Sequence, residues 1–146
     1  MIKVIFIDNS NTVLSAICEV VLKEKLLDTD LDVKVCSAGL QTTDGLPINT
    51  VALKALWLRG YDGDEFTSTS LNVDDLQNYD YVIIMSKQLK FSLPKSKNIC
   101  TYGELVDYNE LKEPSIDEFI TFLDVTADIE NMSDLLIEKI KTNLGV

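Results

Sequence analysis

The sequence predicts an α/β fold: a three-layer α/β/α sandwich around a four-stranded parallel sheet, formed by one domain over residues 1–146. Two observations indicate this. Four short apolar runs, each bounded by polar turns, are typical of buried parallel strands, and helical patterns separate them. The length of 146 residues also fits one domain with its own core. The predicted strands are residues 4–7, 33–36, 81–85 and 98–102.

The first strand leads directly into a polar turn and a helix. Val4–Ile7 is followed by Asp8-Asn9-Ser10-Asn11-Thr12-Val13-Leu14-Ser15, and we expect a helix over residues 12–27 with Asn11 or Thr12 as its N-cap. A turn between a strand and a helix N-terminus presents free backbone N–H groups that favour an anion. Ligands of parallel sheets bind at the carboxyl ends of the strands, so this turn is the predicted site.

The other helices follow from spacing and capping signals. A helix over residues 50–59 would end before Gly60. Ser115-Ile116-Asp117-Glu118 has the pattern of a capping box and predicts the start of a short helix with Phe119 and Phe122. A separate last helix is predicted by apolar residues at helical spacing, which we assign to the core: Ile129, Met132, Leu136 and Ile140.

The composition excludes several classes of function. The net charge is −11, histidine is absent, and Arg59 is the one arginine, so we expect neither nucleic acid nor an anionic membrane as a partner. No apolar run is as long as a membrane span and no signal peptide is found, which predicts a cytoplasmic protein with free, buried cysteines. The acidic composition is compatible with a protein partner, whose identity the sequence does not indicate.

Several stretches resemble the low-molecular-weight protein tyrosine phosphatases and the related thiol-dependent arsenate reductases. The resemblance covers nearly the whole chain and depends on the order of four features: the opening strand and turn, Ser37-Ala38-Gly39 after the second strand, Gly45-Leu46-Pro47 before a helix that ends at residues 58–62, and an aspartate-led third strand that ends at Met85. It implies the phosphotyrosine phosphatase I-like fold.

The family's active-site loop has the pattern Cys-x5-Arg-Ser, and this chain departs from it. The resemblance places Asp8 at the nucleophilic cysteine and Leu14 at the phosphate-binding arginine, while Asn11 and Ser15 match the family. Ser10 stands at the position of the loop glycine. The anion loop that the resemblance implies consists of Asn9, Ser10, Asn11, Thr12, Val13, Leu14 and Ser15.

The general acid of the family is usually the aspartate of a late Asp-Pro pair. Here the nearest candidate is Glu113 of Glu113-Pro114, and Ser115 and Ile116 stand where tyrosines usually follow. The loop after Gly39 is also shorter than usual and lacks the aromatic wall of the substrate slot. We therefore expect a catalytically degenerate phosphatase, a pseudophosphatase with a binding or regulatory role, no catalytic residues and no cofactor.

Two alternatives remain open at this stage. Asp8 and Thr12 match the Asp-x-Asp-x-Thr motif of the haloacid dehalogenase superfamily, which would make Asp8 the nucleophile of a Mg²⁺-dependent phosphohydrolase and place a metal ion beside it. Ser10 replaces the second aspartate of that motif. The other alternative is a phosphatase with residual activity through a rearranged loop, for which Cys18 is the one cysteine near the turn.

Overall fold

The computed structural model describes residues 1–96 and 98–146, and it confirms the α/β fold class. Its sheet has the strand order β2-β1-β3-β4, with all neighbouring pairs parallel. The strands are β1 (Ile2–Asp8), β2 (Val33–Gly39), β3 (Tyr81–Ile84) and β4 (Ile99–Thr101). The α-helices are α1 (Leu14–Leu26), α2 (Thr50–Leu58), α3 (Tyr102–Val106) and α4 (Phe119–Leu144), and two 3₁₀ helices are η1 (Val73–Asn78) and η2 (Lys87–Ser92).

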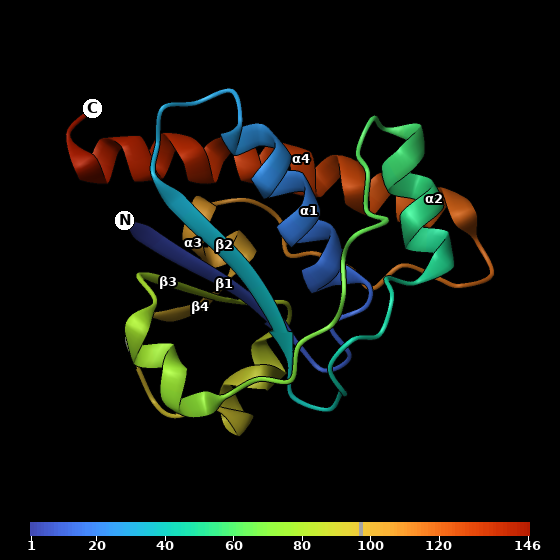
Figure 1. The fold of residues 1–146 in the computed structure, drawn as a ribbon, viewed down its shortest axis with the longest axis horizontal. Coiled ribbons are helices and arrows are strands. Elements are labelled where there is room, and N and C mark those ends of the chain that lie inside the picture. The colour runs from blue at the N-terminus through green and yellow to red at the C-terminus, as the bar shows by residue number, and fades with distance from the viewer. Residues whose placement is uncertain (97) are drawn as a thin grey trace.

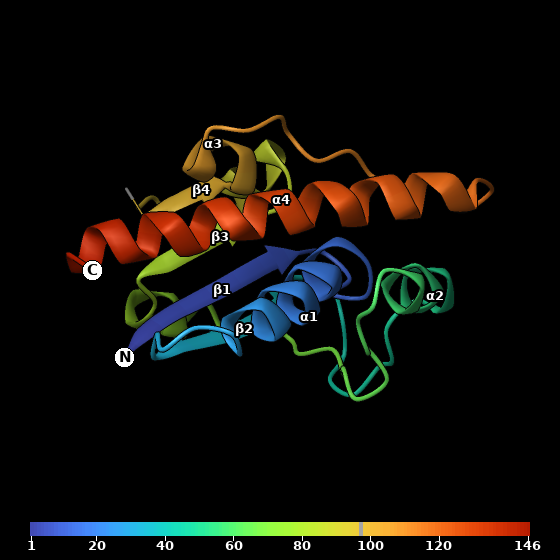
Figure 2. The same ribbon diagram turned by 90° about the horizontal axis from the view of Figure 1, so that it is seen from above.

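The two faces of the sheet are covered differently (Figures 1 and 2). On one face α1, α3 and α4 pack over the larger core, which includes Phe6, Ile17 and Ile129, and α2 packs against α4. The other face carries Ile5, Ile7 and Ile84, and in the described part of the chain its helical cover consists of the short η1 and η2, through Leu76 and Leu89. One outer layer of the sandwich is therefore thin.

The helix boundaries correct two predictions from sequence. Residues 119–144 form one continuous helix of 26 residues rather than two, because apolar side chains keep helical spacing from Phe122 to Ile140 without a break. Ser115 is not its cap: the N-cap is Glu118, with no side-chain capping bond, and the N–H of Ser115 donates to Oγ1 of Thr121. The structure instead places a capping box at Thr101 and Glu104, where α3 begins.

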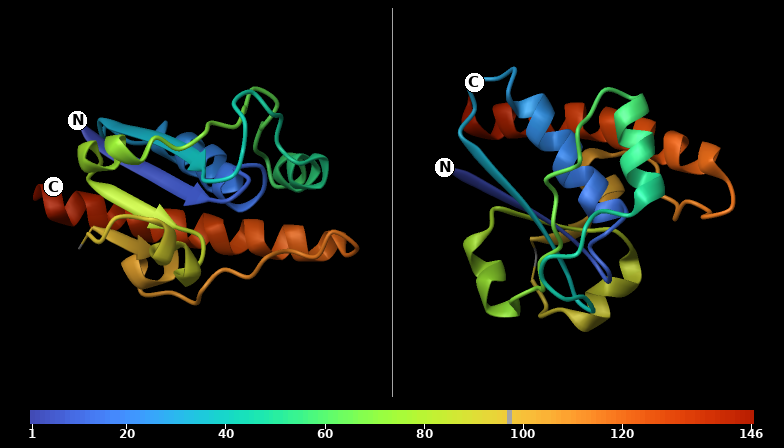
Figure 3. Two further views of the ribbon diagram at one scale, coloured as in Figure 1. Left: turned by 90° about the horizontal axis from the view of Figure 1, so that it is seen from below. Right: turned by 45° about the vertical axis from the view of Figure 1, so that its right-hand side comes forward.

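The start of α1 also differs from the prediction. The helix begins at Leu14 after Val13, and neither Asn11 nor Thr12 caps it. Residues 9–13 form an irregular turn instead, at the carboxyl end of β1. Figure 3 shows that the connections after β1 and β2 lie together at this end, beside the chain that leads from α2 to η1. In the described part of the chain, no helix has the length and apolarity needed to cross a membrane.

Candidate functional site

Asp8 ends β1, and its carboxylate is directed into the turn that follows. Oδ1 accepts a hydrogen bond of 2.7 Å from the N–H of Asn11, and Oδ2 accepts one of 3.0 Å from the N–H of Ser15. The residue is buried, with 8% of its surface exposed. Burial raises the pKa of Asp8 above its ordinary value, although the hydrogen bonds from Ser15 and Asn11 oppose the rise. The amides of this turn therefore already bind a negative group, supplied by the chain.

Asn11 stabilises the conformation of the turn after β1 through its backbone and its side chain. Its φ of 56° lies in the left-handed region, which asparagine tolerates better than most residues. Its fully buried side chain donates 2.8 Å hydrogen bonds to Oγ of Ser15 and of Ser37, and accepts a 2.9 Å bond from the N–H of Thr69. The Ser37 hydroxyl in turn donates to Glu19 on α1 at 2.7 Å. This network joins β2, α1 and the segment before η1 to the turn.

Gly39, at the end of β2, allows the turn to pack closely. A Cβ at this position would lie 2.7 Å from the carbonyl oxygen of Asn9 and 2.8 Å from Cγ2 of Thr42. Two backbone bonds hold the same contact, from the N–H of Leu40 to Asp8 and from the N–H of Gln41 to Asn9. The glycine of the Ser-Ala-Gly segment thus has a physical reason, because a side chain would separate the two connections.

No positively charged side chain of the turn faces Asp8. Leu14, at the first position of α1, is 2% exposed and belongs to the core of the larger face. Arg59 is paired with Glu130 on α4. A shallow groove of 530 Å³ lies beside the turn, and its lining in the described residues is uncharged: Ser10, Thr12, Leu40, Gln41, Thr42, Thr43 and Leu46.

Cys18 lies one turn into α1 and is fully buried, with its Sγ 3.7 Å from Sδ of Met85. Burial, with a further contribution from the charge of Asp8, raises the pKa of its thiol well above the usual range. A buried, protonated thiol is a poor nucleophile. Cys18 is free, as predicted, and so are Cys36 and Cys100, but these two are only half-buried.

Glu113 is electrostatically linked to the turn. Desolvation raises the pKa of its carboxyl, and the negative charge of Asp8 raises it further. It lies in a pocket with Pro114, Asp124 and Asp128 at the start of α4. The position that the resemblance assigns to the general acid therefore holds a carboxyl whose pKa is raised, in part by the charge of Asp8.

Sequence reasoning missed the second ring of contacts around the turn. Thr69 precedes η1 in a segment with no apolar pattern, and its N–H donates to Asn11 while its carbonyl accepts from Gly39. Glu19 of α1, which the sequence analysis did not single out, accepts from Ser37 and pairs with Lys23 at 3.0 Å. The one available signal was Ser37, a polar residue in the half of β2 that is otherwise buried or apolar.

Comparisons with known proteins agree with this architecture. A family model described as low molecular weight phosphotyrosine protein phosphatase matches residues 3–145. A low molecular weight protein tyrosine phosphatase from T. tengcongensis is 25% identical, with a TM-score of 0.86 over 95% of this chain and 99% of that one. A comparison with curated protein sequences gives no match.

Two further solved structures share the fold. The arginine phosphatase YwlE from Geobacillus stearothermophilus is 21% identical, with a TM-score of 0.85 over 98% of this chain and 95% of that one. A protein tyrosine phosphatase from Entamoeba histolytica is 24% identical, with a TM-score of 0.83 over 99% of each chain. The family model spans nearly the whole sequence, and the solved structures share the fold over nearly the whole chain. The chain belongs to the low molecular weight phosphotyrosine protein phosphatase family.

Proposed function

We propose that this protein keeps the phosphatase fold without thiol-phosphatase chemistry and acts as a binding or regulatory module. One observation carries the proposal: the carboxylate of Asp8 accepts the N–H groups of Asn11 and Ser15, which line the turn where the family binds phosphate. An anion-binding turn that holds an internal carboxylate has lost donors that a phosphate would need.

Electrostatics strengthens this argument. Two unit negative charges 4 Å apart repel by about 4 kcal/mol at an effective dielectric of about 20, and a phosphate dianion would meet the Asp8 charge at close range. Arginine normally offsets such repulsion through bidentate hydrogen bonds. Here the corresponding position is Leu14, packed in the core, and Arg59 is engaged by Glu130. Both the nucleophile and the charge stabiliser of the family's reaction are therefore missing.

The proposal predicts a negligible rate of aryl phosphate hydrolysis, with or without Mg²⁺. The test measures the hydrolysis rate of the parent protein and of the Asp8→Asn variant. A thiol-dependent member of the family serves as the positive control. Turnover that requires Mg²⁺ and disappears in Asp8→Asn would contradict the proposal and support aspartate chemistry. Turnover that survives Asp8→Asn but disappears in Cys18→Ser would instead support a rearranged thiol site.

The Mg²⁺-dependent alternative has little support from the donor set. Among the described residues, no group of three or more carboxylate or thiol side chains could hold a metal ion. Glu104, an acidic residue that follows the fourth strand, is used in the capping box of α3 and contacts Lys90 at 3.4 Å. Asp8 itself has each carboxylate oxygen occupied by a backbone N–H. Beryllofluoride capture at Asp8, read by mass spectrometry and ¹⁹F NMR, would reverse this assessment.

A further inference from the structure

Among the described residues, β2 forms one edge of the sheet, and β1 is its one neighbouring strand. In a strand, the N–H and C=O of one residue point to the same side, and successive residues alternate. The carbonyl of Asp32 and the N–H of Leu40 bond to β1, at Ile2 and Asp8 respectively, so even-numbered residues of β2 face β1. The backbone groups of Val33, Val35, Ser37 and Gly39 must therefore point outward.

Of these outward groups, only those of Gly39 are paired. The N–H of Gly39 donates to Thr69, and its C=O accepts from Leu71, which makes a short parallel bridge at the carboxyl end of β2. Within residues 1–96 and 98–146, no hydrogen bond is made by the outward backbone groups of Val33, Val35 or Ser37. In Figure 1 β2 lies in front of β1, and no ribbon covers its first half.

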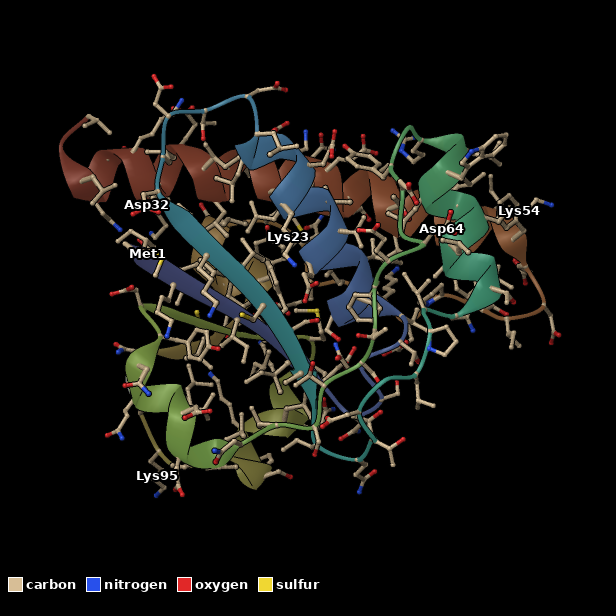
Figure 4. The ribbon with its side chains drawn as sticks, in the orientation of Figure 1. Met1, Lys23, Asp32, Lys54, Asp64 and Lys95 are labelled. Carbon is tan, nitrogen blue, oxygen red and sulfur yellow. The ribbon has the colours of Figure 1, made fainter. Side chains whose placement is uncertain are left out.

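A groove of 380 Å³ lies along the second part of this open edge, from Val35 to Ala38. It runs between β2 and the segment 65–72, and Glu19 and Lys23 of α1 border it. Figure 4 shows Lys23 near the middle of α1. On the side of the sheet covered by η1, the groove has an apolar floor of partly buried side chains, namely Cys36, Leu71 and Tyr79. An added strand would place every second side chain on this floor.

The charges at the groove favour a basic occupant. Glu19 and Lys23 neutralise each other at 3.0 Å. Glu65 and Asp75 are exposed in the lining, and within the described residues neither makes an ion pair. Lys34, exposed on the edge itself, is the one cation of the open strand. A second copy of this chain is a poor occupant, because each copy has a net charge of −11.

We propose that the edge of β2 from Val33 to Ser37 receives an extended segment of a partner protein as a fifth strand, with basic and apolar residues in alternation. The backbone of the segment would bond the outward groups of Val33, Val35 and Ser37, its apolar side chains would cover Cys36, Leu71 and Tyr79, and its basic side chains would meet the acidic rim. The inference goes beyond the proposed function and does not depend on the turn after β1.

The probe is the peptide acetyl-Lys-Val-Lys-Val-Lys-Val-amide, titrated into ¹⁵N-labelled full-length protein. We expect saturable binding at micromolar to millimolar Kd, and slowed hydrogen exchange at the amides of Val33, Val35 and Ser37. Two control peptides isolate the causes: one has glutamate in place of lysine, and one is N-methylated at alternate residues so that it cannot complete the ladder. Both should bind at least 10-fold more weakly.

Protein variants test the same contacts from the other side. Val33→Pro removes an outward N–H at the first residue of β2, where proline is tolerated, and should weaken binding at least 10-fold, whereas Val33→Ala keeps the N–H and should bind as the parent does. The double variant Glu65→Gln with Asp75→Asn should weaken binding more than the exposed control pair Asp117→Asn with Asp124→Asn.

Four results would overturn the proposal. The first is a lack of saturable binding at millimolar peptide. The second is equal binding of the peptide by Val33→Pro and Val33→Ala when circular dichroism shows that both variants are folded. The third is protection from hydrogen exchange at amides outside residues 33–37. Sedimentation that shows a dimer through β2 would assign the edge to a second copy and would overturn it as well. Phosphatase activity has no bearing on any of these readings.

Discussion

Replacing Asp8 by alanine tests whether the turn after β1 is an anion site filled by its own carboxylate. The substitution leaves the N–H groups of Asn11 and Ser15 without acceptors in a buried position. Each unpaired group costs about 1–3 kcal/mol, and loss of the desolvated charge offsets part of that cost. We expect the free energy of unfolding to fall by about 2 kcal/mol, which lowers Tm by roughly 4–8 °C in a chain of this length.

An external anion should then restore part of the loss. If phosphate occupies the emptied position with a Kd of about 1 mM, 10 mM phosphate stabilises the variant by about 1.4 kcal/mol through binding to the folded state. The unmodified protein should gain almost nothing, because Asp8 holds the donors. The assay is urea denaturation in phosphate and in chloride at equal ionic strength, with exposed Asp30→Ala as the matched control.

Two results would refute this reasoning. If the unmodified protein gains as much from phosphate as Asp8→Ala does, the carboxylate does not compete for the site. If Asp8→Ala is as stable as the parent in chloride, the two hydrogen bonds contribute nothing net, and the electrostatic argument for a filled site fails. If phosphate stabilises Asp30→Ala but not Asp8→Ala, the stabilisation by phosphate arises from the loss of a surface charge and not from the turn.

Further predictions concern the same region. Leu14→Ala should reduce the free energy of unfolding by about 2–5 kcal/mol, measured by urea denaturation, because Leu14 is a core residue, whereas Leu14→Met should cost less than about 1.5 kcal/mol. Asn11→Ala should destabilise more than Asn11→Gly by about 1 kcal/mol in the same assay, because only glycine adopts the φ of 56° without strain. Asp8→Asn should lower the pKa of Glu113, followed by ¹³C NMR titration of the side-chain carboxyl, because the charge of Asp8 raises it. The pKa of Asp8 is higher in the folded than in the unfolded state. The stability of the parent relative to Asp8→Asn should therefore rise as pH falls from above the folded pKa toward the ordinary value of 3.8. If denaturation at different pH values shows that this relative stability falls over the same window, the burial argument is contradicted.

Sequence reasoning recovered the sheet because its signals are local. The β-branched runs of β1 and β3 and the glycine after α2 predict their elements without knowledge of tertiary contacts. Capping was harder. Ser115 and Glu118 match a capping box, yet Thr121 binds the Ser115 backbone instead, while Thr101 and Glu104 use the same chemistry unnoticed. A capping-box sequence indicates which hydrogen bonds can form, and the path of the backbone determines which of them do form.

The candidate site was located by sequence but its contacts were not. Asp8 follows a predicted strand, so its place at the carboxyl end of the sheet was predictable. The partners of Asn11 were not, because Ser37 and Thr69 lie 26 and 58 residues further along the chain. Contacts at such separations depend on the strand order β2-β1-β3 and on the path from α2 to η1, and neither leaves a pattern in the sequence around the turn.

The residues at the turn are physically consistent with one another. An arginine at position 14 beside Asp8 would form a buried ion pair, whose desolvation costs several kcal/mol per ion. Leucine avoids that cost and adds apolar contact at the start of α1. The carboxylate then satisfies two N–H groups that an empty turn would leave to water or to a bound anion. The turn is thus held by the chain itself, and the proposed loss of phosphoryl chemistry rests on the same contacts that stabilise the link between β1 and α1.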